Sequence, residues 1–396
     1  MLYISLYLFL NTSIGFHGII VASQSRHQQY NEQLQLLSQT FSKFLKLSCG
    51  KQIQMEHLQL KIKKITNETS SSKSFFIEEI NNKQIEYKAG QFLTLLVNLH
   101  GKEVRRSYSI SSTPGVDEVI YFTIKRIENG ELSRYLFDDL KVGDMLTSLP
   151  PSGRFTIDRP ESKLAVFISA GSGITPVFSL VKHLLYQFAD TDILLIYQNH
   201  DEKESIFRQE LLLLQQKFKE RFTVKEIFSQ PLDHSRPSQR LNNNLLERIL
   251  LQTITASSVH FYLCGPEAFM RMAQFTLKVM HYGQEIIKRE NFFATAPPPP
   301  FMTDTTPRNV IINYHNKKYN LEVAYPHNIL EVALKNKIHL PYSCRGGRCS
   351  TCTSRCTSGS VKMTINDVLT PKDLQNGLIL TCVSYPETDV ELTFDM

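Results

Sequence analysis

The sequence lacks the features of several classes of protein. Its net charge is only +6 over 396 residues, which does not indicate the concentrated basic face of a nucleic-acid-binding protein. It has no tryptophan and no internal repeat. With 42% hydrophobic and 21% charged residues, its composition is that of an ordinary soluble globular protein, and its length allows roughly two to four domains.

The cysteines lack the spread of a disulfide framework. The seven are Cys49, Cys264, Cys344, Cys349, Cys352, Cys356 and Cys382. Five of them lie in the last 53 residues, whereas secreted chains held by disulfides are usually much shorter and use their cysteines throughout. The clustering indicates metal chemistry in a reducing compartment, and we expect a cytoplasmic protein.

The N-terminus lacks the basic residues that begin a secretory signal. Residues 1–23 are mostly apolar and long enough to cross a bilayer, with the body of the chain then on the cytoplasmic side. Two polar residues within the segment weaken that interpretation. The alternative is upstream sequence without a folded role, with Met55 as the start. Residues 30–48 are predicted to form an amphipathic helix, so residues 1–56 are expected to be an extension that permits membrane association.

Three patterns divide the rest of the chain. Residues 57–159 contain dense short strands, typical of an antiparallel barrel or sandwich. Residues 160–293 alternate strands with helices, which predicts a parallel sheet covered on both faces. Four consecutive prolines interrupt the segment 294–307, which is expected to be a semi-rigid linker. Residues 308–396 combine a hairpin, a helix capped by Asn328, a cysteine-rich loop and a closing strand.

The cysteine-rich loop has a specific spacing. Cys344, Cys349 and Cys352 follow the pattern C-x4-C-x2-C, and Cys382 follows at a distance, as in plant-type [2Fe–2S] clusters. Gly346 and Gly347 would let the loop fold tightly and aim N–H groups at the sulfurs. Structural zinc is the alternative, but zinc sites usually use two short cysteine pairs. Cys356 is then spare.

A [2Fe–2S] cluster accepts one electron at a time, whereas a nicotinamide delivers two as a hydride. A flavin can separate the pair, so we expect a flavin site and a nicotinamide site in the same chain. The segment RSYSISS offers an arginine for a pyrophosphate and, two residues on along the same strand face, a tyrosine for an aromatic ring. The segment GELSRYL offers a glycine and a hydroxyl at a helix start, where phosphate can bind.

Two strand-to-helix turns indicate the nucleotide site. In SAGSGITP, Gly171 and Gly173 permit the close approach of a pyrophosphate to a helix N-terminus, although this is not the full G-x-G-x-x-G fingerprint. In YLCGPEAF, Cys264 lies at a second turn on the same edge of the predicted sheet. A buried cysteine is otherwise most often a small core residue.

In this order, the motifs resemble the ferredoxin–NADP(H) reductase superfamily with a fused plant-type ferredoxin domain, and within it the reductase subunits of phenylacetyl-CoA epoxidase and related oxygenases. The resemblance covers about residues 57–396. It implies an antiparallel β-barrel that binds FAD, an α/β parallel-sheet domain that binds NAD(P), and an α+β β-grasp ferredoxin domain.

The resemblance also implies roles for single residues. Cofactor binding is expected from Arg106, Ser107, Tyr108, Ser109, Gly130, Ser133, Gly171, Gly173, Thr175, Cys264, Gly265, Pro266 and Phe292. Ser109 would face the reactive edge of the flavin, Thr175 and Cys264 would border the nicotinamide, and Glu290 would help close the flavin pocket. Ser109, Cys264 and Glu290 are therefore the expected catalytic residues. The cluster ligands would be Cys344, Cys349, Cys352 and Cys382.

The choice of nicotinamide and acceptor is less defined. NADPH-preferring relatives often place an arginine where this chain has His200, so Arg208 or Arg240 would have to hold the 2′-phosphate. We expect NADPH, with NADH as the alternative. The expected acceptor is an oxygenase. A membrane-tethered donor to a desaturase or hydroxylase and a redox-sensing regulatory module are the alternatives, although a sensor needs no hydride entry.

Overall fold

The computed structural model describes residues 57–395 apart from 82–83, 255–257 and 293–296. The described residues all belong to one compact unit, which spans residues 55–396. The predicted apolar segment and amphipathic helix lie outside the described residues. Among the residues that are described, no helix has the length and hydrophobicity needed to cross a membrane.

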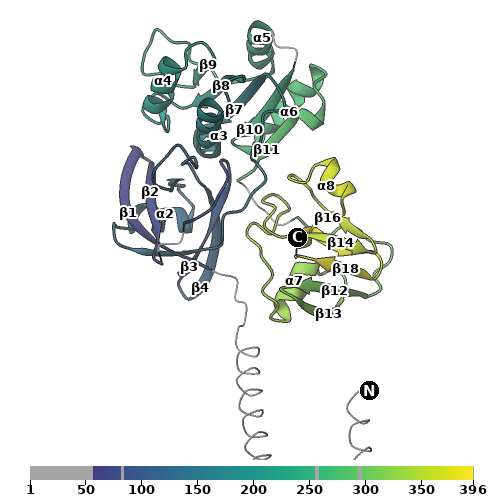
Figure 1. Cartoon of the computed structure of the whole chain (residues 1–396). Helices are drawn as coiled ribbons and strands as arrows, with labels where there is room; N and C mark the ends of the chain where they lie inside the picture. Colours follow the sequence, from purple (N-terminus) through teal and green to yellow (C-terminus); the bar gives the residue numbers. More distant parts are fainter. Residues whose placement is uncertain (1–56, 82–83, 255–257, 293–296, 396) are drawn as a thin grey trace, which may run out of the picture. The chain divides into compact units, whose positions relative to one another are not determined.

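The first domain is built on a six-stranded antiparallel sheet with the order β4-β3-β6-β1-β2-β5 (Figure 1). Its strands are β1 (Leu58–Thr69), β2 (Ser72–Glu79), β3 (Phe92–Leu99), β4 (Lys102–Ser109), β5 (Tyr121–Lys125) and β6 (Met145–Ser148), and helix α2 (Glu131–Asp138) precedes β6. Alternating side chains of these strands, such as Leu60 and Ile62, are fully buried in one core together with Leu132 and Leu136 of α2. The period of two follows from strand geometry.

The two edge strands of this sheet, β4 and β5, approach each other at one place. In the described part of the domain β4 and β5 form no ladder, but Ile110, just beyond β4, forms a bridge to Phe122 of β5. The Ser111 N–H also donates to the Tyr121 carbonyl at 2.9 Å. The predicted antiparallel β domain is confirmed, and its sheet is joined by this local contact rather than by a closed ladder.

The second domain is a five-stranded parallel sheet in the order β11-β10-β7-β8-β9. The strands are β7 (Leu164–Ala170), β8 (Asp192–Asn199), β9 (Phe222–Phe228), β10 (Val259–Cys264) and β11 (Ile287–Glu290). The helices are η1 (Gly171–Gly173), α3 (Ile174–Gln187), α4 (Arg208–Lys217), α5 (Asn243–Thr253), α6 (Glu267–Val279) and η2 (Gln284–Ile286).

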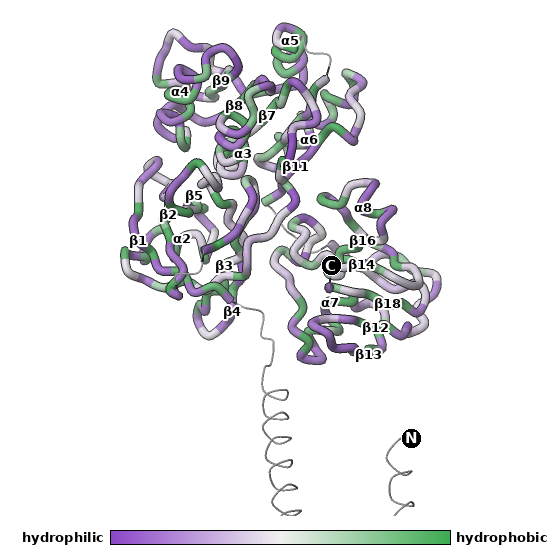
Figure 2. Tube along the Cα trace, viewed as in Figure 1, coloured by the Kyte–Doolittle hydropathy of each residue, from purple (hydrophilic) through white to green (hydrophobic). Residues whose placement is uncertain are grey.

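Helices cover both faces of this sheet, as predicted for strands that read as continuous hydrophobic runs. Phe167 and Leu195 pack in one core with Val177 and Leu180 of α3. The neighbouring strand positions belong to a second core, which contains Leu246 of α5 and Leu277 of α6. Figure 2 shows the hydrophobic colour along β7 and β8, between the helices.

The third domain is a mixed sheet with the order β13-β12-β18-β14-β16, accompanied by the two-stranded pair β15-β17. Its elements are β12 (Arg308–Tyr314), β13 (Lys317–Val323), α7 (Ile329–Lys335), β14 (Thr353–Ser358), β15 (Val361–Met363), α8 (Pro371–Gln375), β16 (Leu378–Leu380), η3 (Thr381–Val383), β17 (Ser384–Pro386) and β18 (Val390–Thr393). The predicted cap at Asn328 is present, because its side chain accepts from the Glu331 N–H. Ile329 and Ala333 pack α7 onto the sheet. This arrangement matches the predicted α+β domain.

Candidate active site and cluster loop

The four predicted cluster cysteines converge. Cys344, Cys349 and Cys352 lie in the loop between α7 and β14, and Cys382 lies in η3. The Cys344 side chain is within hydrogen-bonding reach of those of Cys349 and Cys382, and these contacts lower the pKa of the Cys344 thiol. Cys382 also reaches Cys352, and contact with Cys344 and Cys352 raises the pKa of the Cys382 thiol. Two segments that are far apart in the sequence thus present four sulfurs to one another.

The backbone of the loop turns towards these sulfurs. The Gly346 N–H donates to Cys344 Sγ at 3.3 Å, and the Cys344 N–H donates to Cys349 Sγ at 3.4 Å. Gly347 has φ +71°, and a Cβ there would lie 2.6 Å from Ile365 Cγ2 and 2.8 Å from the Ile365 carbonyl oxygen. Only glycine fits that conformation and that space. Amide donors around thiolates are what an anionic sulfur site requires.

Cys356 lies apart from this group. It is on β14, and its thiol is near the carbonyl oxygens of Ser358 and Gly359, at 3.3 and 3.7 Å. As arranged, no three or more His, Cys, Asp or Glu side chains of the described chain form a site for a metal ion. The donor set of four clustered thiols with amide support nevertheless fits a [2Fe–2S] cluster, which takes four thiolates. Cys344, Cys349, Cys352 and Cys382 would hold it.

Strand β4 presents the predicted flavin motif. Arg106 Nη1 donates to the Arg105 carbonyl at 2.8 Å, and the Arg106 side chain is largely exposed. Tyr108 is largely buried, which raises the pKa of its phenol, and its ring centroid lies 6.1 Å from that of Phe122. Ser109 is buried at the end of the strand. Arg106 is therefore available to bind an anion, and Tyr108, two positions later, offers an aromatic ring in an apolar environment.

Ser107 differs from its neighbours in the motif. Its hydroxyl lies 3.0 Å from Thr94 Oγ1 on β3 and 2.7 Å from the hydroxyl of Ser343. Ser343 directly precedes the cluster cysteine Cys344. Sequence reasoning grouped Ser107 with the cofactor-binding residues and did not anticipate this contact, because the two serines are 236 positions apart.

The turn before α2 is tightly built. The Ser133 hydroxyl donates to the Gly130 carbonyl at 3.1 Å and accepts from the Ile127 N–H at 3.2 Å. A Cβ on Gly130 would lie 2.3 Å from Ser133 Oγ. The hydroxyl is thus engaged within the turn, and the backbone N–H groups at the start of α2 are the remaining donors for an anion.

The carboxyl edge of the parallel sheet brings the other predicted residues together. Cys264, at the end of β10, is paired with Ser169 of β7 on one side and with Glu290 of β11 on the other. Gly173 packs directly on the next turn, where its own Cβ would lie 2.2 Å from the Cys264 carbonyl oxygen. The Thr175 hydroxyl donates to the Ser172 carbonyl at 3.0 Å. Gly265 and Pro266 then lead into α6.

Glu290 is a buried acid at this edge. The residue is 5% exposed. Burial, together with the neighbouring Cys344, raises the pKa of Glu290 to about 8. Burial and the charge of Glu290 raise the pKa of the Cys264 thiol as well. Glu290 thus lies between the nucleotide edge and the cluster loop, and its raised pKa favours the protonated carboxyl. Phe292 is more open, with 40% of its surface exposed.

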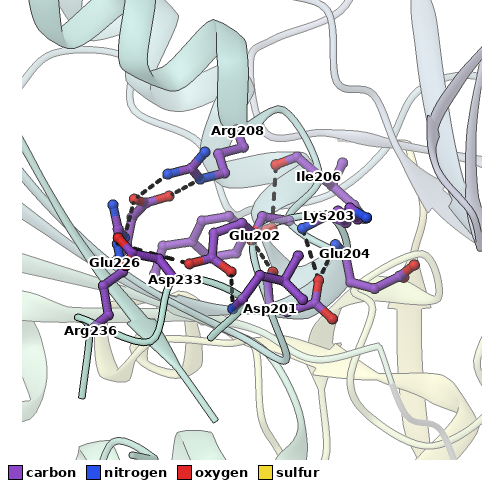
Figure 3. A network of polar contacts seen from close by, with 12 residues as sticks. Asp201, Glu202, Lys203, Glu204, Ile206, Arg208, Glu226, Asp233 and Arg236 are labelled. Atoms are coloured by element: carbon purple, nitrogen blue, oxygen red, sulfur yellow. Dashed lines mark hydrogen bonds and ion pairs between the residues drawn. The ribbon is translucent and has the colours of Figure 1, made fainter. Parts of the chain in front are cut away.

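A network of charged side chains lies around Glu226 of β9 and the segment that follows β8 (Figure 3). Glu226 accepts from Arg208 Nε at 2.6 Å and Nη2 at 3.0 Å, and from Arg236 Nη1 at 2.9 Å. Arg236 Nε is also 3.9 Å from a Glu202 oxygen. Arg240, in contrast, is exposed and makes no hydrogen bond or ion pair with the described chain. Arg208 is therefore committed to Glu226, whereas Arg240 is available.

Three family descriptions match the chain in the order of these domains. Residues 57–157 match the oxidoreductase FAD-binding domain, residues 167–274 the oxidoreductase NAD-binding domain, and residues 312–387 the 2Fe-2S iron-sulfur cluster binding domain. The ferredoxin reductase component of 3-ketosteroid-9-alpha-monooxygenase from Mycobacterium tuberculosis is 31% identical over 355 residues, which are 85% of this chain and 96% of that protein. The chain belongs to the ferredoxin–NADP(H) reductase superfamily and carries a fused [2Fe–2S] domain. It is an oxidoreductase that uses FAD, [2Fe–2S] and NAD(P)H.

Two further comparisons support this placement. A component of 1,2-phenylacetyl-CoA epoxidase from Escherichia coli is 30% identical over 356 residues, covering 85% of this chain and 97% of that protein. Phthalate dioxygenase reductase has the same fold, with a TM-score of 0.54 at 24% identity over 86% of this chain and 98% of that one.

Proposed function

We propose that this reductase supplies electrons to a separate oxygenase, through FAD and the [2Fe–2S] cluster, at the expense of NAD(P)H. The observation that carries the proposal is the convergence of four cysteine thiols, three of them in a loop that touches the flavin strand β4 through Ser343 and Ser107. The relatives are named as components of a ketosteroid monooxygenase and an epoxidase. An oxygenase is therefore the acceptor class we assign.

The flavin would be held mainly by β4 and the turn before α2. When bound, FAD supplies the exchange between one hydride and two single electrons. The exposed guanidinium of Arg106 would bind its pyrophosphate, and backbone N–H groups of the Gly130–Ser133 turn would add donors. Tyr108 would pack on the flavin ring, and the Ser109 hydroxyl would face the ring edge where hydride arrives.

The nicotinamide would lie at the carboxyl edge of the parallel sheet. Gly171, where a Cβ would meet nothing within 4 Å, leaves space for the pyrophosphate at the start of α3, and Gly173 lets the Cys264 turn lie directly against this one. Thr175 and the turn of Cys264, Gly265 and Pro266 would border the nicotinamide. Glu290, which carries a proton at neutral pH because burial raises its pKa to about 8, would donate a hydrogen bond into the site, and Phe292 would cover the ring from outside.

We assign the 2′-phosphate of NADPH to Arg240. The Leu241 N–H donates to Gln198 of β8 at 2.5 Å, so the Arg240 backbone is held at the carboxyl end of the second strand. In doubly wound folds this position contacts the adenosine ribose. Arg240 has no competing carboxylate among the described residues, whereas Arg208 does.

The proposal predicts the composition and reactions of the purified protein. It should contain one FAD and two irons per chain, and NAD(P)H should reduce ferricyanide through the flavin and cytochrome c through the cluster. Metal analysis and steady-state assays measure both. A preparation that contains zinc and no iron would contradict the proposed cluster. A cluster that is reduced at the full rate without FAD would contradict the proposed role of the flavin. We also propose a cytoplasmic location, because five of the seven cysteines cluster in the last 53 residues instead of being spread as a disulfide framework.

A further inference from the structure

Strand β4 has a second face that contacts the cluster loop. Arg105 and Ser107 are two positions apart on the strand, so their side chains share a face. The Arg105 guanidinium lies 4.2 Å from the centroid of the Tyr342 ring, and the Ser107 hydroxyl lies 2.7 Å from that of Ser343. We call these four residues the β4–cluster-loop contact. Arg106 and Tyr108 belong to the opposite face.

The Arg105 side chain is enclosed in this contact. Only 11% of it is exposed, and its Nε donates to Glu103 at 2.7 Å. Its Nη1 is buried and has no hydrogen-bond partner among the described residues. The Tyr342 ring, which also lies 4.4 Å from the Arg345 guanidinium, is thus the main partner of that end of the guanidinium. A cation against an aromatic face is stabilised most where water is excluded.

Each side of the contact is adjacent in sequence to one of the two redox sites. Ser107 precedes Tyr108 of the flavin motif, and Ser343 precedes the cluster cysteine Cys344. We propose that the β4–cluster-loop contact positions the [2Fe–2S] cluster for electron transfer from the flavin, with Arg105 and Tyr342 as positioning residues. This rests on the proposed function. NAD(P)H and one solvent proton give the flavin two electrons, which then cross the contact one at a time to an oxidised acceptor, while two protons return to solvent.

Other contacts hold the cluster domain in place independently. Asp367 of the cluster domain accepts from Arg289 Nη2 of β11 at 2.9 Å, and Asp373 of the same domain pairs with Arg154. Loss of the Arg105–Tyr342 contact should therefore misalign the loop without releasing the domain. This separates a positioning role from a general role in folding.

The test uses the full-length protein with FAD and cluster bound, as wild type, Arg105→Ala, Tyr342→Ala, the double variant and Tyr342→Phe. Stopped-flow spectroscopy measures flavin reduction and cluster reduction separately. We expect flavin reduction within about twofold of wild type, and cluster reduction slowed on the order of tenfold in Arg105→Ala and in Tyr342→Ala, the scale of a desolvated cation–π contact. The double variant should be no slower than the singles, and Tyr342→Phe should restore the rate.

Hydrogen exchange provides a readout that does not depend on turnover. Peptides covering 103–109 and 340–346 should exchange faster in Arg105→Ala, with iron content and the spectrum of the reduced cluster unchanged. Tyr186→Ala is the matched control, because it removes a 44% exposed ring that lies 4.6 Å from Lys217 within one domain, and it should change neither rate. Additive effects of the two substitutions, equal slowing of both stages, or unchanged exchange in Arg105→Ala would overturn the proposal. A wild-type cluster that NAD(P)H cannot reduce would refute the function, whereas exchange would still report on the contact.

Discussion

Substituting alanine for Gly173 tests whether the nucleotide edge depends on two turns that touch through their backbones. Gly173 has helical dihedrals, φ −61° and ψ −13°, so alanine is conformationally allowed. Its Cβ, however, would lie 2.2 Å from the Cys264 carbonyl oxygen, 2.5 Å from the Cys264 carbonyl carbon and 2.8 Å from the Gly265 nitrogen. No side-chain rotation relieves a clash between backbones, so one turn must move by roughly 1 Å.

The control is Gly171→Ala, in which the backbone conformation is unfavourable for alanine but the added Cβ meets no clash. Gly171 has φ +55°, and a Cβ there meets nothing within 4 Å. Its cost is conformational, about 1 kcal/mol, and the reduced entropy of the unfolded chain offsets roughly 0.5 kcal/mol of it. For Gly173→Ala the clash costs about 3 kcal/mol, offset by the same amount. The net costs are therefore about 0.5 and about 2.5 kcal/mol.

Thermal unfolding followed by flavin fluorescence measures this difference. We expect Gly173→Ala to lower the apparent Tm by roughly 8 °C and Gly171→Ala by roughly 2 °C, on the scale of a domain of this size. Because the displaced turn borders the nucleotide site, Gly173→Ala should also raise the KM for NAD(P)H about tenfold, with iron content unchanged. If both variants were equally stable, or if Gly173→Ala matched wild type, the close approach of the two turns would not be a feature of the folded protein.

Three other substitutions or cuts follow from the site. Cys382→Ser should lose most of the iron, whereas Cys356→Ser should keep it. The reason is that the Cys382 side chain contacts two other cluster cysteines, whereas that of Cys356 contacts none. Metal analysis measures the iron content, and the reverse result would reassign the ligands. Cleavage engineered within Pro297–Pro300 should preserve NAD(P)H–ferricyanide activity but remove most cytochrome c reduction. The ion pairs of Arg289 and Arg154 with the cluster domain then act without the linker, so the cluster is no longer kept beside the flavin at high effective concentration. Undiminished cytochrome c reduction would contradict this. Arg240→Ala should weaken the binding of 2′,5′-ADP about tenfold and leave the affinity for 5′-ADP unchanged. Arg208→Ala should not change the affinity for one of the two ligands more than for the other. Calorimetry measures both affinities, and equal losses for the two ligands in Arg240→Ala would show that Arg240 does not bind the 2′-phosphate.

Local patterns predicted much of the architecture. The Asn328 cap and the hairpin of β12 and β13 depend on a few neighbouring residues and appear where the sequence indicates. The cysteine spacing also predicted the convergence of four thiols, because a cluster loop is itself a local structure with one distant ligand. Helix α4 begins at Arg208, because Asp201 accepts from the Lys203 and Glu204 N–H groups and holds the preceding residues in a turn.

What the sequence could not provide were pairings between distant elements. Arg208 was a candidate for phosphate binding until the fold placed Glu226 of β9 beside it. Arg105 attracted no attention, because its partner Tyr342 lies in another domain. Charge neutralisation and cation–π contact depend on tertiary position, and a single sequence does not encode them in any local spacing.

The two adjacent arginines of the flavin strand show why this matters for function. Arg105 and Arg106 are identical in type and neighbours in sequence, but a strand sends them to opposite faces. Arg105 is enclosed against Tyr342, whereas Arg106 is exposed and donates only to a backbone carbonyl. The same alternation separates Ser107, which contacts the cluster loop, from Tyr108, which lies beside Phe122. A shift of β4 by one residue would exchange these two sets, so the register of one strand determines both the flavin contacts and the approach of the cluster.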